Sequence, residues 1–250
     1  MGYFVPAYHF LMENKRDEFA LIDCGPMNKW FELLPRQPLK VLDAVEAMQI
    51  GYRSRGTGFA RRYRVESFVD WDVFKRFPSR PIKPVAEDIA QRFPLNTSSS
   101  DDTHPSVVVF SRSHSDPALL NHPYRKFGTA KRDIANLDDL GAFLASSYHV
   151  TLVDGARQSP LDIIHACQGA DVLLGQHGAA LANALFALPG TRVAEIGWDS
   201  NHSRLFGHYR ELCRALGLPW SYLPLQTDQF SSVDPGRLKD ALDELVSAFG

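Results

Sequence analysis

The stretch that most constrains the fold of this 250-residue chain runs from position 169 to 198, GADVLLGQHGAALANALFALPGTRVAEIGW. The short apolar run Val172–Leu174 ends at Gly175 and predicts a buried strand. After a Gln-His-Gly turn, residues 179–186 are rich in helix formers, and residues 192–196 have the composition of a second strand. A strand, a glycine-containing turn, a helix and a further strand together predict a βαβ unit.

The turn inside this unit has the chemistry of an anion-binding site. His177 lies where the carboxyl end of the first strand meets the helix, which is where open α/β sheets bind their ligands. Gly178, Ala179 and Ala180 have almost no side chain, and the first turn of a helix offers free N–H groups to phosphate. The alternative is that these small residues only let the helix and the sheet pack closely, and the turn alone does not decide between the two.

From position 106 onward, strand and helix patterns alternate along the chain. Asn136 and Ser159 each precede a helical pattern and are predicted N-caps, and Pro160 at the first helical position supports the second of these starts. Repeated alternation predicts a parallel, Rossmann-type sheet with helices on both faces. The other predicted strands are 107–110, 150–153 and 220–223, and the other predicted helices are 137–146, 160–168, 202–216 and 235–249.

Residues 1–95 show the weakest periodicity and predict a smaller, less regular N-terminal α/β domain. Its predicted strands are 19–22 and 65–69, and its predicted helix is 40–48. Arginines and tyrosines between positions 52 and 64 form either a solvated loop or a patch for an anionic or sugar partner. The polar run 96–105, NTSSSDDTHP, predicts a linker, so we expect domains at 1–95 and 106–250.

Composition excludes several classes of protein. The formal net charge of -2 argues against a nucleic-acid-binding protein. Cys24, Cys167 and Cys213 have no CxxC spacing, which indicates neither a zinc site nor a disulfide framework. No apolar run is long enough to span a membrane, and the first residues lack the pattern of a signal peptide. This chain alone is therefore expected in the cytoplasm, or in the Golgi or ER lumen if an N-terminal anchor is missing from it.

The C-terminal half resembles glycosyltransferase family 61, a group that includes plant xylosyltransferases and secretory-pathway O-linked N-acetylglucosaminyltransferases. The resemblance covers about residues 106–225 and is most specific between His177 and Glu195. Two residues depart from the family pattern: Ala180 replaces the usual glycine and Ala182 the usual threonine. The matching residues are Ser111, Arg112, Arg132, Ile134, Asn136, Gly175, His177, Gly178, Ala179, Leu181, Asn183, Leu185, Phe186, Pro189, Gly190, Glu195 and Ile196.

The resemblance implies a GT-B-like, metal-independent, inverting glycosyltransferase without a cofactor. Its donor would be a nucleotide-diphosphate sugar, UDP-linked, and a sugar such as xylose or N-acetylglucosamine would pass to a hydroxyl of a glycan or protein. The alternative is a degenerate, non-catalytic nucleotide-sugar-binding protein, which the departures at Ala180 and Ala182 favour. A dinucleotide-dependent enzyme is a third class, and it is weakened because no G-x-G-x-x-G follows a predicted strand.

Several residues are candidates for holding the donor. Arg112, at the end of a predicted strand, and Arg132 are expected to clamp the diphosphate, because guanidinium forms bidentate bonds to phosphate; Lys131 and Arg125 could substitute. His177 is expected to donate to the diphosphate or the sugar, unless it is a structural cap of the turn. The remaining candidates are Gly178, Ala179 and Ala180 in the turn, Asn183 on the helix as a donor contact or a brace, and Glu195 as an acceptor for ribose hydroxyls or the partner of Arg192 or Arg210.

The catalytic base is not assigned by the sequence. In a GT-B-like enzyme it is expected from the N-terminal domain, where His9 and Asp23 are candidates. His202 and His208 are six positions apart, which is not one helix face, and no HExxH occurs, so no metal site is expected.

Overall fold

The structure of the chain is a computed structural model. The structure describes residues 4–14, 19–23, 25–43, 45–46, 82–95, 104–111, 134–198, 207–227 and 231–247. The chain divides into two compact units, residues 2–76 and residues 77–250. In the described part of the chain, no helix is long and apolar enough to cross a membrane.

The first unit contains a small parallel strand pair. Strands β1 (Leu21–Ile22) and β2 (Val41–Leu42) pair in parallel, and helices α1 (Phe4–Glu13) and η1 (Gly25–Leu33) complete the described elements. The predicted strand at 19–22 is confirmed in part by β1. The predicted helix at 40–48 is wrong at its start, because residues 41 and 42 pair with β1 instead. The predicted strand at 65–69 and the arginine- and tyrosine-rich segment lie outside the described residues.

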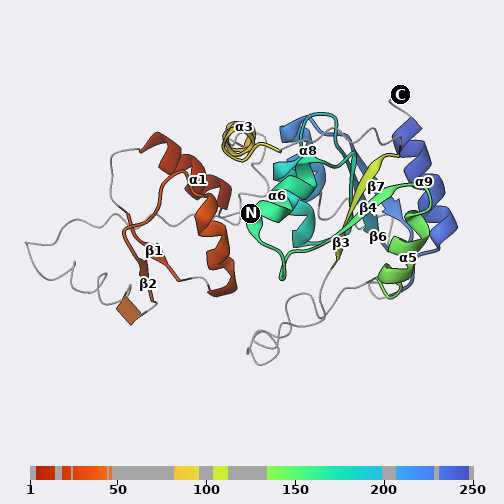
Figure 1. Ribbon diagram of the computed structural model, residues 1–250, viewed down its shortest axis with the longest axis horizontal. Helices are drawn as coiled ribbons and strands as arrows, with labels where there is room; N and C mark the ends of the chain where they lie inside the picture. Colours follow the sequence, from red (N-terminus) through yellow and green to blue (C-terminus); the bar gives the residue numbers. More distant parts are fainter. Residues whose placement is uncertain are drawn as a thin grey trace, which may run out of the picture. The chain divides into compact units, whose positions relative to one another are not determined.

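The second unit is built on a five-stranded, entirely parallel sheet (Figure 1). The strand order across the sheet is β4-β3-β5-β6-β7. The predicted α/β class, with a parallel sheet in the C-terminal half, is confirmed. The strands are β3 (Ser106–Ser111), β4 (His149–Asp154), β5 (Val172–Gln176), β6 (Arg192–Gly197) and β7 (Trp220–Pro224).

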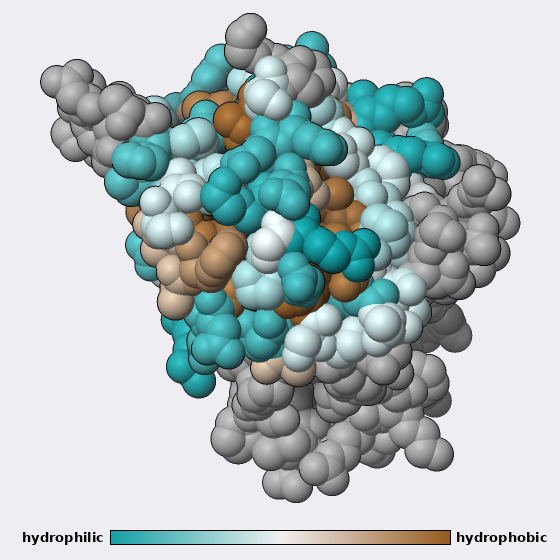
Figure 2. All heavy atoms as spheres, turned by 90° about the vertical axis from the view of Figure 1, so that its right-hand side faces the viewer, coloured by the Kyte–Doolittle hydropathy of each residue, from teal (hydrophilic) through white to brown (hydrophobic). Residues whose placement is uncertain are grey.

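Helices cover both faces of this sheet, as the alternating pattern predicts (Figure 1). Alternate residues of each strand point to opposite faces, so Val107, Val172 and Leu174 join a core with helices α5 (Leu137–Leu144) and α9 (Pro235–Ser247). The face of the molecule on which α9 lies is largely hydrophilic, with hydrophobic residues in separate patches (Figure 2). The opposite layer contains α6 (Pro160–Gln168), η5 (Ala179–Phe186), α8 (His208–Leu216) and α3 (Ile82–Arg92).

The two predicted N-caps have different outcomes. Ser159 caps α6 as expected, since its Oγ accepts a hydrogen bond from Asp162 N at 3.2 Å and Pro160 occupies the first turn. Asn136 precedes α5 but makes no cap bond. Its amide instead donates to Val233 O at 2.8 Å, and its carbonyl accepts from Val233 N at 2.9 Å. The cap prediction for Asn136 is wrong because a distant loop offers both a donor and an acceptor.

Helix α3 is not predicted by the sequence analysis, and it packs against helices α8 and η5 of the second unit. Ile82, Val85 and Ile89 recur at helical spacing, are buried, and lie on the side that meets α8 and η5. The Gln168 side chain also donates to Phe93 O at 3.0 Å, just beyond the end of α3. The compact units divide at residues 76 and 77, so α3 belongs to the second unit, although the sequence assigned it to residues 1–95.

Candidate functional site

The strand order places a topological switch point between β3 and β5. From β3 the chain first adds β4 on one side, and then crosses over to add β5 on the other side. Ligands of open α/β sheets bind outside the carboxyl ends of the strands at such a point. The carboxyl ends here are Ser111 of β3 and Gln176 of β5, so the turn that contains His177 begins at the switch point.

The turn after β5 is held to the sheet by its backbone. His177 N donates to Ile196 O at 2.8 Å, which extends the pairing of β5 with β6 by one residue. Gly178 follows with φ 156° and ψ 178°, a conformation that is essentially restricted to glycine. Residues 179–186 then form a 3-10 helix, in which Leu181 N donates to Gly178 O at 3.0 Å. The predicted helix is confirmed, and its first turn closes with i→i+3 bonds. The binding of phosphate by its first N–H groups stays a prediction.

His177 is joined to Glu195 and Trp220 in a buried chain of hydrogen bonds. The exposed fractions of His177 and Glu195 are 5% and 2%. His177 Nδ1 is hydrogen-bonded to Glu195 Oε1, and Trp220 Nε1 donates to Glu195 Oε2 at 3.0 Å. Both carboxylate oxygens are therefore engaged by side chains from β7 and from the turn after β5.

Helix α8 supplies further neighbours of this buried chain. The rings of Tyr209 and His177 lie 5.5 Å apart, centroid to centroid, in an edge-on arrangement. Burial and the nearby His177 lower the pKa of His208, although Glu195 acts in the opposite direction. Burial, assisted by the Glu195 charge, raises the pKa of the Cys213 thiol to about 12. Both groups are therefore neutral near pH 7.

A second buried polar pair lies at the end of β5. Gln176 Nε2 donates to Gln226 Oε1 at 2.8 Å, and Gln226 Nε2 donates to Ser231 O at 2.8 Å. These bonds tie the strand before the His177 turn to the segment between β7 and α9. The turn is therefore positioned from both sides of the sheet.

The structure brings together only some of the predicted site residues. His177, Gly178 and Glu195 converge, Ala179 begins η5, Ala180 is half-buried in its first turn, and Asn183 is buried on the same helix. Arg112, Arg132, Lys131 and Arg125 lie outside the described residues, although Arg112 directly follows the last residue of β3. The contacts of Glu195 are with His177 and Trp220, rather than with the arginines Arg192 or Arg210 considered above.

The two candidate bases lie in the first unit. His9 Nε2 is 3.5 Å from Glu13 Oε1 on α1, and Asp23 Oδ1 accepts a hydrogen bond from Asn28 at 2.7 Å. Their role as bases stays a prediction. Among the residues that the structure describes, no group of three or more His, Cys, Asp or Glu side chains could hold a metal ion.

Trp220 is a neighbour of the candidate site that the sequence analysis missed, because it donates a hydrogen bond to Glu195. In the register of the sheet, Trp220 pairs with Val193 and Tyr222 pairs with Glu195, so Trp220 and Glu195 share one face of neighbouring strands. The alternation of Trp220 and Tyr222 was a visible signal. Its meaning depended on strand register, which cannot be read from a parallel strand's own sequence.

The comparison with known protein families agrees with this geometry. A search among curated proteins found no significant match. The family model described as Glycosyltransferase 61 matches residues 8–194, which is more than half of the chain and includes β3, β5 and the His177 turn. The chain therefore belongs to the glycosyltransferase 61 family.

Proposed function

We propose that this protein is a GT-B-like, metal-independent, inverting glycosyltransferase that uses a nucleotide-diphosphate sugar, UDP-linked. The acceptor would be a hydroxyl of a glycan or protein, and the transferred sugar one such as xylose or N-acetylglucosamine. The observation that carries this proposal is the position of the His177 turn, at the carboxyl end of β5 and at the switch point of the sheet. Membership of the glycosyltransferase 61 family supports the same class of reaction.

The chemistry requires stabilisation of negative charge on the departing diphosphate. Fixed donors and cations do this best when they are in place before the reaction. His177 is held by a backbone bond to Ile196 and by Glu195, so it is preorganised. Arg112 and Arg132 are our candidates for the cations, because guanidinium binds phosphate oxygens in a bidentate manner.

The reaction also requires a base that takes the proton of the acceptor hydroxyl. In an inverting displacement this base acts on the face of the sugar opposite to the leaving diphosphate. We therefore look for it away from the His177 turn, and His9 and Asp23 remain our candidates.

The second candidate function is a non-catalytic nucleotide-sugar-binding protein. Ala182 is half-buried on η5 and has no hydroxyl to offer a ligand, in contrast to the usual threonine of the family pattern. Ala180 narrows the conformations open to the first turn of that helix. A protein of this kind would keep the donor site and lack turnover.

A binding screen followed by an activity assay distinguishes the two functions. Calorimetry with a panel of nucleotide-diphosphate sugars identifies the donor, and product analysis then measures transfer to acceptors and hydrolysis of the donor. Transfer supports the glycosyltransferase. Tight donor binding with neither transfer nor hydrolysis supports the binding protein, and no binding of any donor contradicts both.

Replacement of Arg112 tests the phosphate site. We expect Arg112→Ala to weaken UDP binding about 10- to 100-fold, because a charge-assisted bond to phosphate is lost, while uridine affinity stays nearly unchanged. Calorimetry with the two ligands measures the ratio. The matched control is Arg214→Ala on α8, an exposed arginine paired with Glu211, which should change neither affinity. Equal losses for UDP and uridine in Arg112→Ala would remove Arg112 from the phosphate site.

A further inference from the structure

We propose that Glu195 and Trp220 are positioning residues that hold the His177 ring protonated on both nitrogens when a diphosphate is bound, with Nε2–H donated to a phosphate oxygen. This inference rests on the proposed function and specifies how its donor site treats the leaving diphosphate. It assigns a role to Trp220 and changes the role expected for Glu195.

The first step concerns the direction of the hydrogen bonds. An ionised carboxylate only accepts, and the indole N–H of Trp220 only donates. Trp220 Nε1–H occupies Glu195 Oε2 at 3.0 Å, and His177 Nδ1 is bound to Glu195 Oε1. Nδ1 therefore carries a proton and donates it. Because this bond is made in both charge states of the ring, the charge of the ring changes at Nε2.

The second step concerns the buried charge. Glu195 is 2% exposed, and an unpaired buried carboxylate is strongly disfavoured. Trp220 is neutral, so it satisfies an oxygen without cancelling the charge. Of the side chains that the structure describes, His177 is the one within ion-pair distance of Glu195 that can carry a positive charge.

The third step concerns the ligand. A neutral ring with its proton on Nδ1 presents a lone pair at Nε2, and a lone pair repels a phosphate oxygen. A ring protonated on both nitrogens presents an N–H donor there, while Glu195 balances its positive charge within the protein. The pair therefore binds an anion through a charge-assisted hydrogen bond and remains neutral as a unit.

The neighbouring titratable groups leave this arrangement undisturbed. On α8, the pKa of His208 is lowered, first by burial and then by His177, so His208 adds no second positive charge. The raised pKa of Cys213 keeps its thiol neutral beside Glu195.

The first experiment reads the ring directly. Long-range ¹H–¹⁵N spectra of the 250-residue chain report which nitrogens of each histidine are protonated, and the His177 signals are assigned by their loss in His177→Gln. With saturating UDP, we expect both His177 nitrogens to be protonated. An unprotonated Nε2 in the UDP complex would overturn the inference.

The second experiment separates positioning from ribose binding. In Glu195→Gln the neutral amide cannot balance the ring charge, so we expect UDP affinity to fall about tenfold with little change for uridine, since charged hydrogen bonds are roughly twice as strong as neutral ones. Trp220→Phe keeps an aromatic ring and removes the N–H. We expect this variant to lose about threefold in UDP affinity relative to uridine affinity. Equal losses for UDP and uridine would support the ribose role of Glu195 and overturn the inference.

The matched control is Tyr148→Phe. It also removes one hydrogen bond to a carboxylate, but Tyr148 immediately precedes the edge strand β4, at the amino end of the parallel sheet, whereas His177 follows the carboxyl end of the central strand β5. It should lower the melting temperature without changing the UDP-to-uridine ratio. A protein that binds no nucleoside diphosphate contradicts the proposed function together with the inference, whereas UDP binding without a doubly protonated His177 contradicts the inference alone.

Discussion

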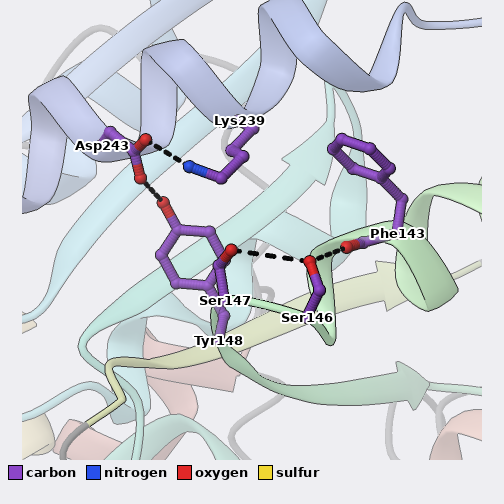
Figure 3. A network of polar contacts seen from close by, with 6 residues as sticks. All are labelled: Phe143, Ser146, Ser147, Tyr148, Lys239 and Asp243. Atoms are coloured by element: carbon purple, nitrogen blue, oxygen red, sulfur yellow. Dashed lines mark hydrogen bonds and ion pairs between the residues drawn. The ribbon is translucent and has the colours of Figure 1, made fainter.

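The Tyr148 hydroxyl joins the segment before β4 to helix α9 (Figure 3). It donates to Asp243, which also accepts a bond from Lys239 Nζ at 2.6 Å. Burial raises the pKa of Tyr148 above its usual value. The pKa of Asp243 is lowered because Lys239, and then Tyr148, donate hydrogen bonds to its charged form. A single phenol therefore connects the core to an exposed ion pair.

We expect Tyr148→Phe to lower the free energy of unfolding by about 1 kcal/mol at pH 7, the net value of one hydrogen bond. Because the folded pKa of Asp243 is depressed, its contribution is present above the unfolded value of 3.8 and is lost as pH falls through the folded pKa. The difference in the free energy of unfolding between wild type and Tyr148→Phe should therefore be smaller at acid pH. Urea unfolding at pH 7 and pH 3 measures it.

The control for this residue is Ser146→Ala, which removes an exposed bond to Phe143 O and should change stability by less than about 0.5 kcal/mol. If the difference in the free energy of unfolding between wild type and Tyr148→Phe grows at acid pH, the assigned role of Asp243 is contradicted.

At the scale of elements, Asn136 links the start of α5 to the segment before α9. Its amide makes both bonds that the backbone of Val233 requires, and Val233 is buried in the core shared by the two helices. The side chain therefore joins two segments that are 97 positions apart in the chain through two hydrogen bonds. This contact explains why Asn136, which stands at the N-cap position of α5, does not cap that helix.

We expect Asn136→Ala to lower the free energy of unfolding by about 1–3 kcal/mol, because it leaves a buried donor and acceptor without partners. The comparison is Ser159→Ala, which removes the cap of α6 and should cost about 1 kcal/mol. Thermal and urea denaturation measure both. If Asn136→Ala is no more destabilising than a substitution of an exposed residue, the two hydrogen bonds between Asn136 and Val233 do not stabilise the fold.

At the scale of the whole molecule, the assignment of α3 decides which fragment can fold. Ile82, Val85 and Ile89 cover α8 and η5, which stand beside the His177 turn. Removal of α3 would expose the buried side chains of these helices to water. The predicted linker at 96–105 stays a prediction, and two fragments of the chain test it.

We expect a fragment of residues 77–250 to unfold cooperatively and a fragment of residues 106–250 to be clearly less stable. Burial of the three apolar side chains of α3 is worth about 1.5–3 kcal/mol each as an upper estimate. Circular dichroism melts of the two fragments test this. Equal melting temperatures would show that α3 does not stabilise the second unit, and would favour the boundary at 96–105.

How much of the fold the sequence determined depends on the range of the interactions involved. The strands of the second unit, the helix started by Ser159 and Pro160, and the left-handed Gly217 that ends α8 follow from apolar periodicity and local capping. These are interactions between residues a few positions apart, and their signals lie within one segment. Helix α3 carried the same kind of signal, but Pro84 obscured it because proline disrupts the interior of a helix. Pro84 lies in the first turn of α3, where proline is tolerated.

The sequence also predicted the turn that contains His177 and the strands on either side of it, because these segments are contiguous in the chain. Only the tertiary structure decided which side chains touch. Strand register brought Trp220 to Glu195 and Glu195 to His177, and the order of the sheet put their turn at the switch point. Tertiary packing likewise placed the Asn136 side chain against the backbone of Val233, so that it does not cap its own helix. Hydrogen bonds between distant segments depend on how the strands pair and pack, and no local pattern records that pairing.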